Sequence, residues 1–347
     1  MYNWALIGYG GMGGWHVRKL LTLPEIKVAG VYDILPERNA AAEAEGVRAY
    51  PSLEALLSDK DVNFVTIATP NDTHLPLVVE ALAAGKHVIC EKPVALSLAE
   101  LQTMIDASRR CGRLFCSHQN RRWDEDYLII KKIFKDDELG GVFNIESRVH
   151  GSRGVPSDWR NEIAHGGGMI LDWGVHLIDQ VLLLTDEPVV STWCGVTHVT
   201  NDEVDDGFKT VITFGSGLTA LVEVGTSNFV SMPRWYMQGR NGTTVIEDWE
   251  LNGKTVMVSD WHKRDAVPVA TAAGLTKTMA PRTEETIKNY PLPRIESDVC
   301  DFYRNFLSAM AGEAQLIVKH AEMLRVMKLL EAMKESARLD QVVHTRI

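Results

Sequence analysis

The first third of the chain alternates short apolar runs with helical patterns. Five runs that are almost wholly apolar and end in polar residues predict strands at 4–8, 27–33, 63–70, 86–93 and 113–120. Apolar residues recur at helical spacing over 14–23, 35–44, 52–59, 74–85 and 97–112. Strands that are apolar on both faces are typical of a parallel sheet covered by helices. The repeated alternation therefore predicts a doubly wound parallel sheet.

The pattern changes after about residue 121. A helical segment at 124–140 is followed by strands in which apolar and polar residues alternate, at 142–150, 189–199, 208–214, 218–226, 243–248 and 254–259. Helical spacing returns over 297–336, whereas 262–293 lacks periodicity and is either an excursion near the active site or a surface loop. We therefore expect an α/β protein with two domains. Residues 1–120 form the parallel domain, and 121–347 form an α+β domain with a large, mostly antiparallel, open sheet.

Composition narrows the class of partner. The 347 residues carry a formal net charge of −10 and no run rich in Lys or Arg, which argues against nucleic acid or an anionic membrane. The first residues do not read as a signal peptide, and no run of about 18 apolar residues is present. The five cysteines are scattered without zinc-finger spacing, so we expect reduced thiols, a cytoplasmic protein and no metal.

A glycine-rich loop follows the first strand and opens the first helix. Its sequence is Gly8-Tyr9-Gly10-Gly11-Met12-Gly13, which fits G-x-G-x-x-G. Such a loop lets the backbone approach a pyrophosphate at the positive end of a helix. Asp33 ends the second strand, where a carboxylate binds ribose hydroxyls and repels a 2′-phosphate. These features favour NAD over NADP. Arg38 is the one residue that argues for NADP, because its side chain could reach a 2′-phosphate if the loop bends back.

The ends of two further strands are expected beside the same ligand. In open α/β sheets the ligand lies in a crevice outside the carboxyl ends of the strands. Thr69-Pro70-Asn71 and His74 follow the third strand, and Glu91-Lys92 follow the fourth. Without the other motifs, the segment after the third strand could equally be a turn that caps a helix. Lys92 could equally be a solvent-exposed loop residue without a catalytic role.

A second candidate site lies in the middle of the chain. Gly166-Gly167-Gly168 precede a helical segment in which Asp172, His176 and Asp179 share one face. A histidine is suited to removing a hydroxyl proton, and a neighbouring carboxylate can fix its tautomer. The alternative is that Asp172 and His176 pair only to stabilise the start of the helix. A metal site is disfavoured because the sequence places no third ligand nearby.

Together these motifs resemble the glucose–fructose oxidoreductase, inositol dehydrogenase and rhizopine catabolism (Gfo/Idh/MocA) family. The resemblance rests on the loop at 8–13, Asp33, "TPNDTH" at 69–74, "EKP" at 91–93, "NRRW" at 120–123 and "GGGMILDWGVHLID" at 166–179. It implies a Rossmann domain followed by a domain whose open sheet is a substrate platform and, often, an oligomer interface. It also implies metal-free oxidation of a secondary alcohol of a sugar, inositol or polyol, or the reverse reduction.

The resemblance also implies residue roles. Lys92 would hydrogen-bond the substrate hydroxyl, His176 would be the general acid/base, and Asp172 would bind the adjacent hydroxyl. Whether Lys92 or His176 takes the proton stays open, since a hydrogen-bonded pair shares its titration. The further candidates for substrate contact are Asn120, Arg122, Arg153, Trp159, Arg160, His165, Trp173 and Trp235. The polar stretch 150–168 fits packing against a partner subunit equally well, and the tryptophans also fit core positions. By the same analogy we expect a homodimer or homotetramer joined through the C-terminal sheet.

Three functions fit this pattern. The first is an NAD-dependent dehydrogenase acting on a CH–OH group of a small polyol or sugar. The second is a redox glycosidase, in which oxidation of a glycoside acidifies a neighbouring C–H, the glycosidic bond is eliminated and retained NAD is regenerated. The third is a dinucleotide-sensing regulator without catalysis. The joint presence of Lys92, Asp172 and His176 argues against the third.

Overall fold

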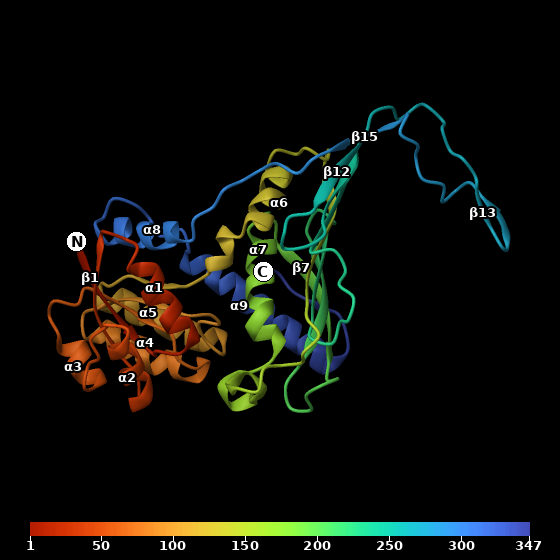
Figure 1. Cartoon of the computed structure of the whole chain (residues 1–347). Helices are drawn as coiled ribbons and strands as arrows, with labels where there is room; N and C mark the ends of the chain where they lie inside the picture. The colour runs from red at the N-terminus through yellow and green to blue at the C-terminus, as the bar shows by residue number, and fades with distance from the viewer.

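A computed structural model describes all residues, 1–347. The N-terminal sheet has the strand order β2-β1-β3-β4-β5, and every neighbouring pair is parallel. Its strands are β1 (Tyr2–Ile7), β2 (Ile26–Tyr32), β3 (Phe64–Ile67), β4 (His87–Cys90) and β5 (Phe115–Ser117). The connecting helices are α1 (Gly11–Leu20), α2 (Pro36–Ala44), α3 (Leu53–Ser58), α4 (His74–Ala83) and α5 (Leu98–Cys111). The predicted doubly wound parallel sheet is confirmed (Figure 1).

The strand order determines where a ligand can bind. β1 lies between β2 and β3, so the chain leaves β1 toward one side of the sheet and later returns to the other side. In such sheets a crevice opens beside the carboxyl end of the strand at this switch point. The loops after β1, β3 and β4 all begin at that edge, and they carry the sequence motifs.

The C-terminal sheet has nine strands in the order β15-β12-β11-β10-β6-β9-β8-β7-β16. β6 and β9 run parallel, and the other neighbours are antiparallel. The strands are β6 (Val142–His150), β7 (Val189–Thr197), β8 (Gly207–Phe214), β9 (Thr219–Gly225), β10 (Trp235–Gly239), β11 (Gly242–Ile246), β12 (Gly253–Val258), β15 (Ile287–Tyr290) and β16 (Val343–His344). The large, mostly antiparallel sheet predicted for this half is therefore present.

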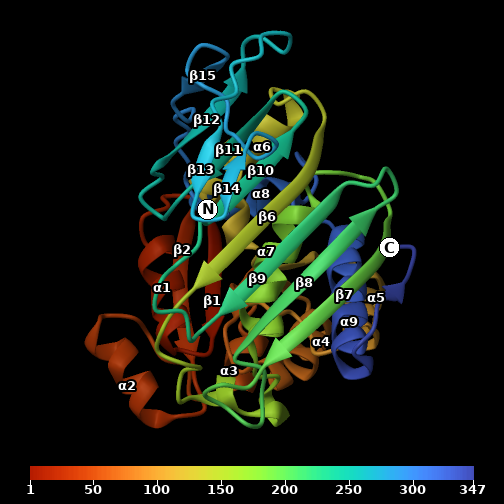
Figure 2. The same ribbon diagram turned by 90° about the vertical axis from the view of Figure 1, so that its right-hand side faces the viewer.

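One face of this sheet packs on helices, and the other is uncovered. α6 (Glu125–Lys135), α7 (Val175–Leu182) and α9 (His320–Leu339) lie between the sheet and the N-terminal domain, as Figure 1 shows. Figure 2 looks onto the uncovered face. β9 alternates strictly between buried and partly exposed residues, which is the pattern of a sheet with one packed face.

The aperiodic segment at 262–293 is a surface excursion. It contains a separate hairpin of β13 (Val269–Thr271) and β14 (Gly274–Thr276), followed by β15 at the edge of the large sheet. Figure 1 shows that the hairpin extends far from the body of the molecule. The alternative that this segment lies near the active site is therefore wrong.

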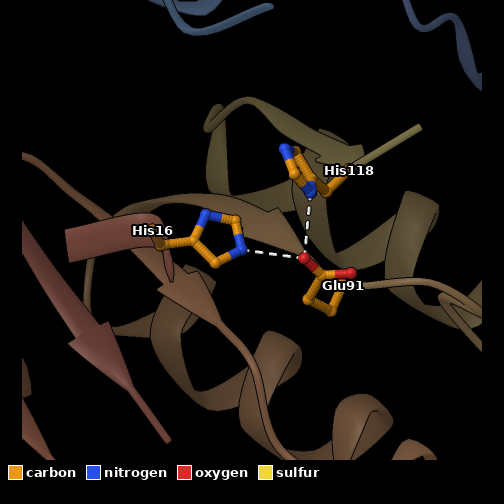
Figure 3. Close-up of side chains that lie close together, drawn as sticks. All are labelled: His16, Glu91 and His118. Atoms are coloured by element: carbon orange, nitrogen blue, oxygen red, sulfur yellow. Dashed lines mark hydrogen bonds and ion pairs between the residues drawn. The ribbon is translucent and has the colours of Figure 1, made fainter. Parts of the chain in front are cut away.

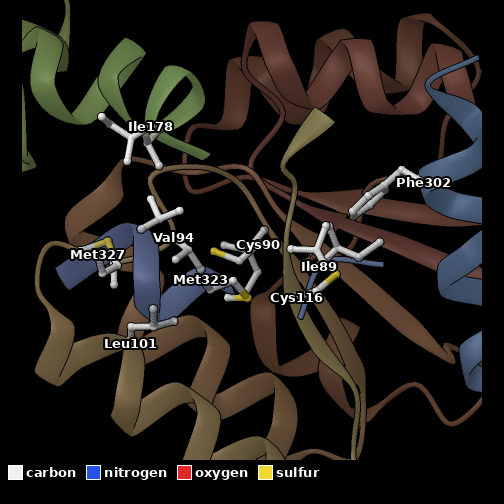
Figure 4. Packing of buried hydrophobic residues seen from close by; sticks show 14 of the residues in the cluster. Ile89, Cys90, Val94, Leu101, Cys116, Ile178, Phe302, Met323 and Met327 are labelled. Atoms are coloured by element: carbon white, nitrogen blue, oxygen red, sulfur yellow. The ribbon is translucent and has the colours of Figure 1, made fainter. Parts of the chain in front are cut away.

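The predicted boundary at residue 120 does not separate two independent units. After the large sheet, the chain returns to the N-terminal domain as α8 (Cys300–Met310), where Phe306 stacks on Phe64. α9 then packs on α5, α7 and β7. One hydrophobic cluster runs through both domains; Figure 4 shows Ile89 and Cys90 of β4 in the same cluster as Ile178 and Met323. The two domains thus share a core.

Candidate active site

A cavity of about 510 Å³ lies between the carboxyl edge of the parallel sheet and the start of α7. From the N-terminal motifs it is lined by Gly10, Gly11, Met12, Thr69, Pro70, Asn71, Glu91 and Lys92. From the remaining motifs it is lined by Asn120, Trp159, Arg160, Asp172, Trp173 and His176. A larger hollow of about 860 Å³ near Tyr2 and Lys86 contains none of the predicted site residues. The smaller cavity is therefore the candidate active site.

The glycine-rich loop leaves room for a ligand at the start of α1. Gly8 has φ +95°, and a Cβ there would lie 2.5 Å from the carbonyl oxygen of Ala68. A Cβ on Gly13 would lie 2.1 Å from the carbonyl oxygen of Gly8, so both positions require glycine. Gly11 has no atom within 4 Å of such a Cβ, and no side chain caps α1. The first N–H groups of the helix therefore face open space, which fits a dinucleotide pyrophosphate.

Asp33 is held in place at the end of β2. Its carboxylate accepts hydrogen bonds from the backbone N–H groups of Tyr9, at 2.7 Å, and Leu35, at 2.9 Å. Arg38, which lines the cavity, lies 3.3 Å from the same carboxylate. Asp33 is nearly buried and does not itself line the cavity. The arrangement keeps a negative charge next to the glycine-rich loop and holds the Arg38 guanidinium against it.

The residues after β3 join the site to its surroundings. Asn71 donates through Nδ2 to the carbonyl oxygen of Gly166, at 3.1 Å, and so links the two domains across the cavity. His74 is fully buried, and its ring nitrogens lie 3.0 Å from the carbonyl oxygens of Pro93 and Thr69. His74 therefore ties two loops together and does not line the cavity, in contrast to the prediction that it contacts cofactor.

Lys92 and Asp172 form an ion pair in the cavity. The Lys92 ammonium donates to the carboxylate Oδ1 and to the carbonyl oxygen of Asp172, both at 2.9 Å. The Arg160 guanidinium approaches the same Oδ1 at 3.5 Å. Burial alone would raise the pKa of Asp172, but the Lys92 and Arg160 cations outweigh it, so the pKa is lowered. Asp172 is therefore a carboxylate that orients Lys92.

His176 is buried at the cavity wall with one nitrogen free. Burial lowers the pKa of His176 well below its usual value, and the nearby Lys92 and Arg121 cations lower it further. Its Nδ1 is buried without a hydrogen-bond partner. Nδ1 is therefore not the nitrogen that a bound substrate would reach, but a neutral imidazole at a cavity wall is suited to accept a proton from a bound hydroxyl.

The expected pairing of Asp172 with His176 is wrong. The segment expected to be a regular helix begins with a π-helical turn at Ile170–Gly174 and becomes α-helical only at α7. Asp172 pairs with Lys92 rather than with His176. Asp179, expected on the same face, is buried in an ion pair with Arg122 at 2.6 Å.

Four other candidates for substrate contact lie away from the cavity or on its rim. Arg122 is buried, pairs with Asp179 and Glu322, and does not line the cavity; its neighbour Arg121 does. Arg153 is exposed on the loop after β6. Trp235 is buried and donates its indole N–H to Asp126 at 2.8 Å, which is a core role. His165 lies 2.9 Å from Asp72, so it joins the loop before α7 to the N-terminal domain.

Sequence reasoning missed a buried cluster behind Lys92, drawn in Figure 3. One carboxylate oxygen of Glu91 lies 2.8 Å from His16 Nε2 and 2.9 Å from His118 Nδ1. The Tyr303 hydroxyl lies 2.6 Å from the other nitrogen of His16 and 3.3 Å from that of His118. The second carboxylate oxygen of Glu91 accepts from the backbone N–H of Lys92 at 3.0 Å. This closed ring of hydrogen bonds supports the backbone that carries Lys92.

His16, Glu91 and His118 are residue types that can bind a metal ion, and their possible ligand atoms lie within 4.8 Å of one another. Their hydrogen bonds account for this arrangement. Burial would raise the pKa of Glu91, but His118 and His16 hold it well below its usual value, so the carboxylate accepts from both rings. Nothing in the sequence places His16, Glu91 and His118 together, since they come from α1, the end of β4 and the end of β5.

No helix of the structure is long and apolar enough to cross a membrane. The five cysteines are all free thiols.

Comparison with known proteins relates both halves of the chain to one group of enzymes. A family model described as "Oxidoreductase family, NAD-binding Rossmann fold" matches residues 2–118, and the "GFO/IDH/MocA C-terminal domain" matches 127–245. The crystal structure of an NAD-binding protein from Listeria innocua is 47% identical, with a TM-score of 0.96 and 99% of each chain covered. The uncharacterized oxidoreductase YdgJ of Escherichia coli is 28% identical over 96% of each chain. The scyllo-inositol 2-dehydrogenase (NADP(+)) IolW of Bacillus subtilis is 26% identical, with 96% of this chain and 93% of IolW covered.

Proposed function

Because the chain belongs to the GFO/IDH/MocA family of NAD(P)-binding oxidoreductases, we propose that it is an NAD-dependent dehydrogenase. Its reaction is the transfer of a hydride from a secondary alcohol carbon of a sugar, inositol or related polyol, or the reverse. One observation carries this proposal: Lys92, Asp172 and His176 line the same cavity as the glycine-rich loop.

The loop and Asp33 support NAD as the cofactor. Gly8 to Gly13 and the uncapped start of α1 would hold the pyrophosphate, and the region of Asp33 would receive the adenosine ribose. When bound, NAD supplies the hydride acceptor. A 2′-phosphate would carry its negative charge near the buried Asp33 carboxylate, and the Arg38 guanidinium that could attract it is paired with that carboxylate. The proposal therefore differs from IolW, which is named as NADP-dependent.

We infer different tasks for the three side chains. The substrate hydroxyl is placed between His176 and Lys92, and the neutral imidazole of His176 accepts its proton as the hydride leaves the same carbon. Lys92 donates a hydrogen bond to the oxygen and stabilises the negative charge that develops there. Asp172 holds the ammonium and accepts a hydrogen bond from the adjacent hydroxyl. We assign the proton to His176 because an ammonium paired with a carboxylate has no lone pair to accept it.

The experiment that tests this function follows the absorbance of reduced nicotinamide with purified protein. NAD and NADP are offered in parallel with a panel of inositols, aldoses, aldonates and glycosides. Reduction of NAD by one class of polyol, with slower or no reduction of NADP, supports the proposal. Binding of dinucleotide without reduction by any member contradicts it and favours the regulator or the redox glycosidase.

A further inference from the structure

We propose that the substrate is a glycoside with a second sugar ring, and that this ring packs on Trp249 in a hollow beside the catalytic cavity. The inference rests on the proposed dehydrogenase function and names its substrate class. The hollow has a volume of about 490 Å³ and shares two residues, Arg121 and Trp173, with the catalytic cavity. The two spaces therefore adjoin at these two side chains, and a ligand wider than one ring would reach the hollow by passing beside them.

The wall between the two spaces is a stack of planar groups. The Arg121 guanidinium carbon lies 4.2 Å from the centre of the Trp173 ring and 5.6 Å from that of Trp249. The two indole rings are 6.2 Å apart. The Arg234 guanidinium lies 5.0 Å from the centre of the Trp249 ring, and its partner Asp126 is also buried. Cations over aromatic faces attract the rings and hold them in position.

Trp249 is exposed although its loop is fixed. About 48% of its surface is open to solvent, which is unusual for the largest apolar side chain. The loop between β11 and β12 is organised by Asp248, whose carboxylate accepts from the backbone N–H groups of Glu250 and Asn252, both at 3.1 Å. Leu251 adopts a left-handed conformation with φ 63°. The indole is therefore presented by a shaped turn rather than left exposed on a loose one.

The chemistry of the hollow fits a sugar. A pyranose ring has one face of C–H groups, which packs on a flat indole, and a rim of hydroxyls, which requires donors and acceptors. His150 also lines the hollow, but its Nε2 is buried 3.5 Å from the Glu223 carboxylate and its Nδ1 accepts from the backbone N–H of Met232, so neither ring nitrogen is open to a ligand. Arg121 supplies a donor at the junction. A monosaccharide bound at Lys92 and His176 would leave the exposed Trp249 ring unused.

The test compares three matched ligands of the sugar that the protein oxidises: the free sugar, its methyl glycoside and a disaccharide of it. With the native chain we expect the disaccharide to have the highest kcat/KM and the methyl glycoside to resemble the free sugar. Trp249→Ala is expected to lower the ratio of kcat/KM for disaccharide over free sugar about tenfold, the scale of one aromatic contact. Trp249→Phe, which keeps a ring, is expected to restore most of that ratio.

Trp261→Ala is the matched control, because Trp261 is similarly exposed, stacks on Arg282 and lies outside both cavities. It should leave the ratio unchanged. A ratio unaffected by Trp249→Ala, or a disaccharide that is no better than the methyl glycoside in the native chain, would overturn the inference while leaving the dehydrogenase intact. Failure of the proposed function is a different result, in which no sugar reduces NAD.

Discussion

The three side chains at the centre of the site carry different charges because their surroundings differ. Asp172 lies beside two cations and remains a carboxylate, whereas His176 is buried near cations and remains neutral. Lys92 is held by two hydrogen bonds to Asp172. In the proposed mechanism, proton acceptance and stabilisation of the oxygen charge are thus separated between His176 and Lys92.

Replacing Lys92 tests its half of this division. Lys92→Ala is expected to cut kcat by about two orders of magnitude or more, because a positioned group that acts on the transition state is lost. NAD affinity should change little, since the glycine-rich loop is untouched. Steady-state kinetics and a fluorescence titration with the dinucleotide measure the two quantities. Unchanged turnover would remove Lys92 from the mechanism.

The pKa of His176 predicts the acid side of the pH profile. A base works when it is unprotonated, so a pKa well below 6.5 keeps His176 active as the pH falls through that value. We expect kcat/KM for alcohol oxidation to stay level from neutral pH through 6.5 and to decline only at lower pH. His176→Asn should lower kcat/KM throughout and abolish that decline. A profile that falls with a midpoint near 6.5 in the native chain would contradict the assignment.

At the scale of elements, sequence patterns are most reliable where burial is complete. β3 and β4 were predicted because strands buried on both faces read as continuous apolar runs, and the motifs at their ends follow directly. β15 and β16 are the short strands at the two edges of the large sheet, and their sequences show little alternation of apolar and polar residues. β10 does alternate in burial, but Arg234 before it and Gly239 at its end obscure its short pattern.

Sequence patterns also predict only part of the candidate active site. Loop motifs identified Lys92, Asp172 and His176, because each motif is local in the sequence. The choice of Arg121 rather than Arg122 for the cavity depends on the turn at Asn120–Trp123, and adjacent arginines are equivalent to a pattern. The π-helical turn that directs Asp172 to Lys92 has no sequence signature. His16, His118 and Tyr303 are brought to Glu91 only by the packing of α1 and α8 on the sheet.

α8 is expected to stabilise the strand end that carries Lys92. Tyr303→Phe removes a hydroxyl and leaves a buried nitrogen of His16 unpaired, so the free energy of unfolding should fall by about 1–3 kcal/mol. Urea unfolding of the two proteins measures the change. Tyr290→Phe is the control, because Tyr290 is about half exposed on β15. Equal losses in the two variants would show that the ring of hydrogen bonds adds nothing.

At the scale of the whole molecule, the uncovered face of the large sheet suggests how copies associate. Trp193, Val211 and Leu221 lie opposite one another on β7, β8 and β9, and their side chains are partly exposed on that face. The β13–β14 hairpin extends from the same side of the molecule (Figures 1 and 2). A row of apolar side chains across neighbouring strands is typical of an interface. We therefore propose a homodimer or homotetramer joined through this face.

A charge in the middle of that row should separate the copies. Trp193→Asp is expected to lower the mass measured by light scattering to that of a single chain, because an unpaired carboxylate is costly in an apolar interface. Leu21→Asp changes an exposed leucine directly after α1, in the N-terminal domain, and should leave the mass unchanged. Identical masses for Trp193→Asp and the native protein, above that of one chain, would place the interface elsewhere.

In the proposed function, this cavity moves a hydride from a substrate carbon to the nicotinamide. A substrate from the panel that carries deuterium on the carbon to be oxidised, followed by mass spectrometry of the cofactor, would show this transfer. We expect the native protein to form reduced NAD that contains one deuterium, and Lys92→Ala to form almost none. Reduced NAD without deuterium, or cleavage of a glycoside with the deuterium returned to the sugar and no net NAD reduction, would contradict it.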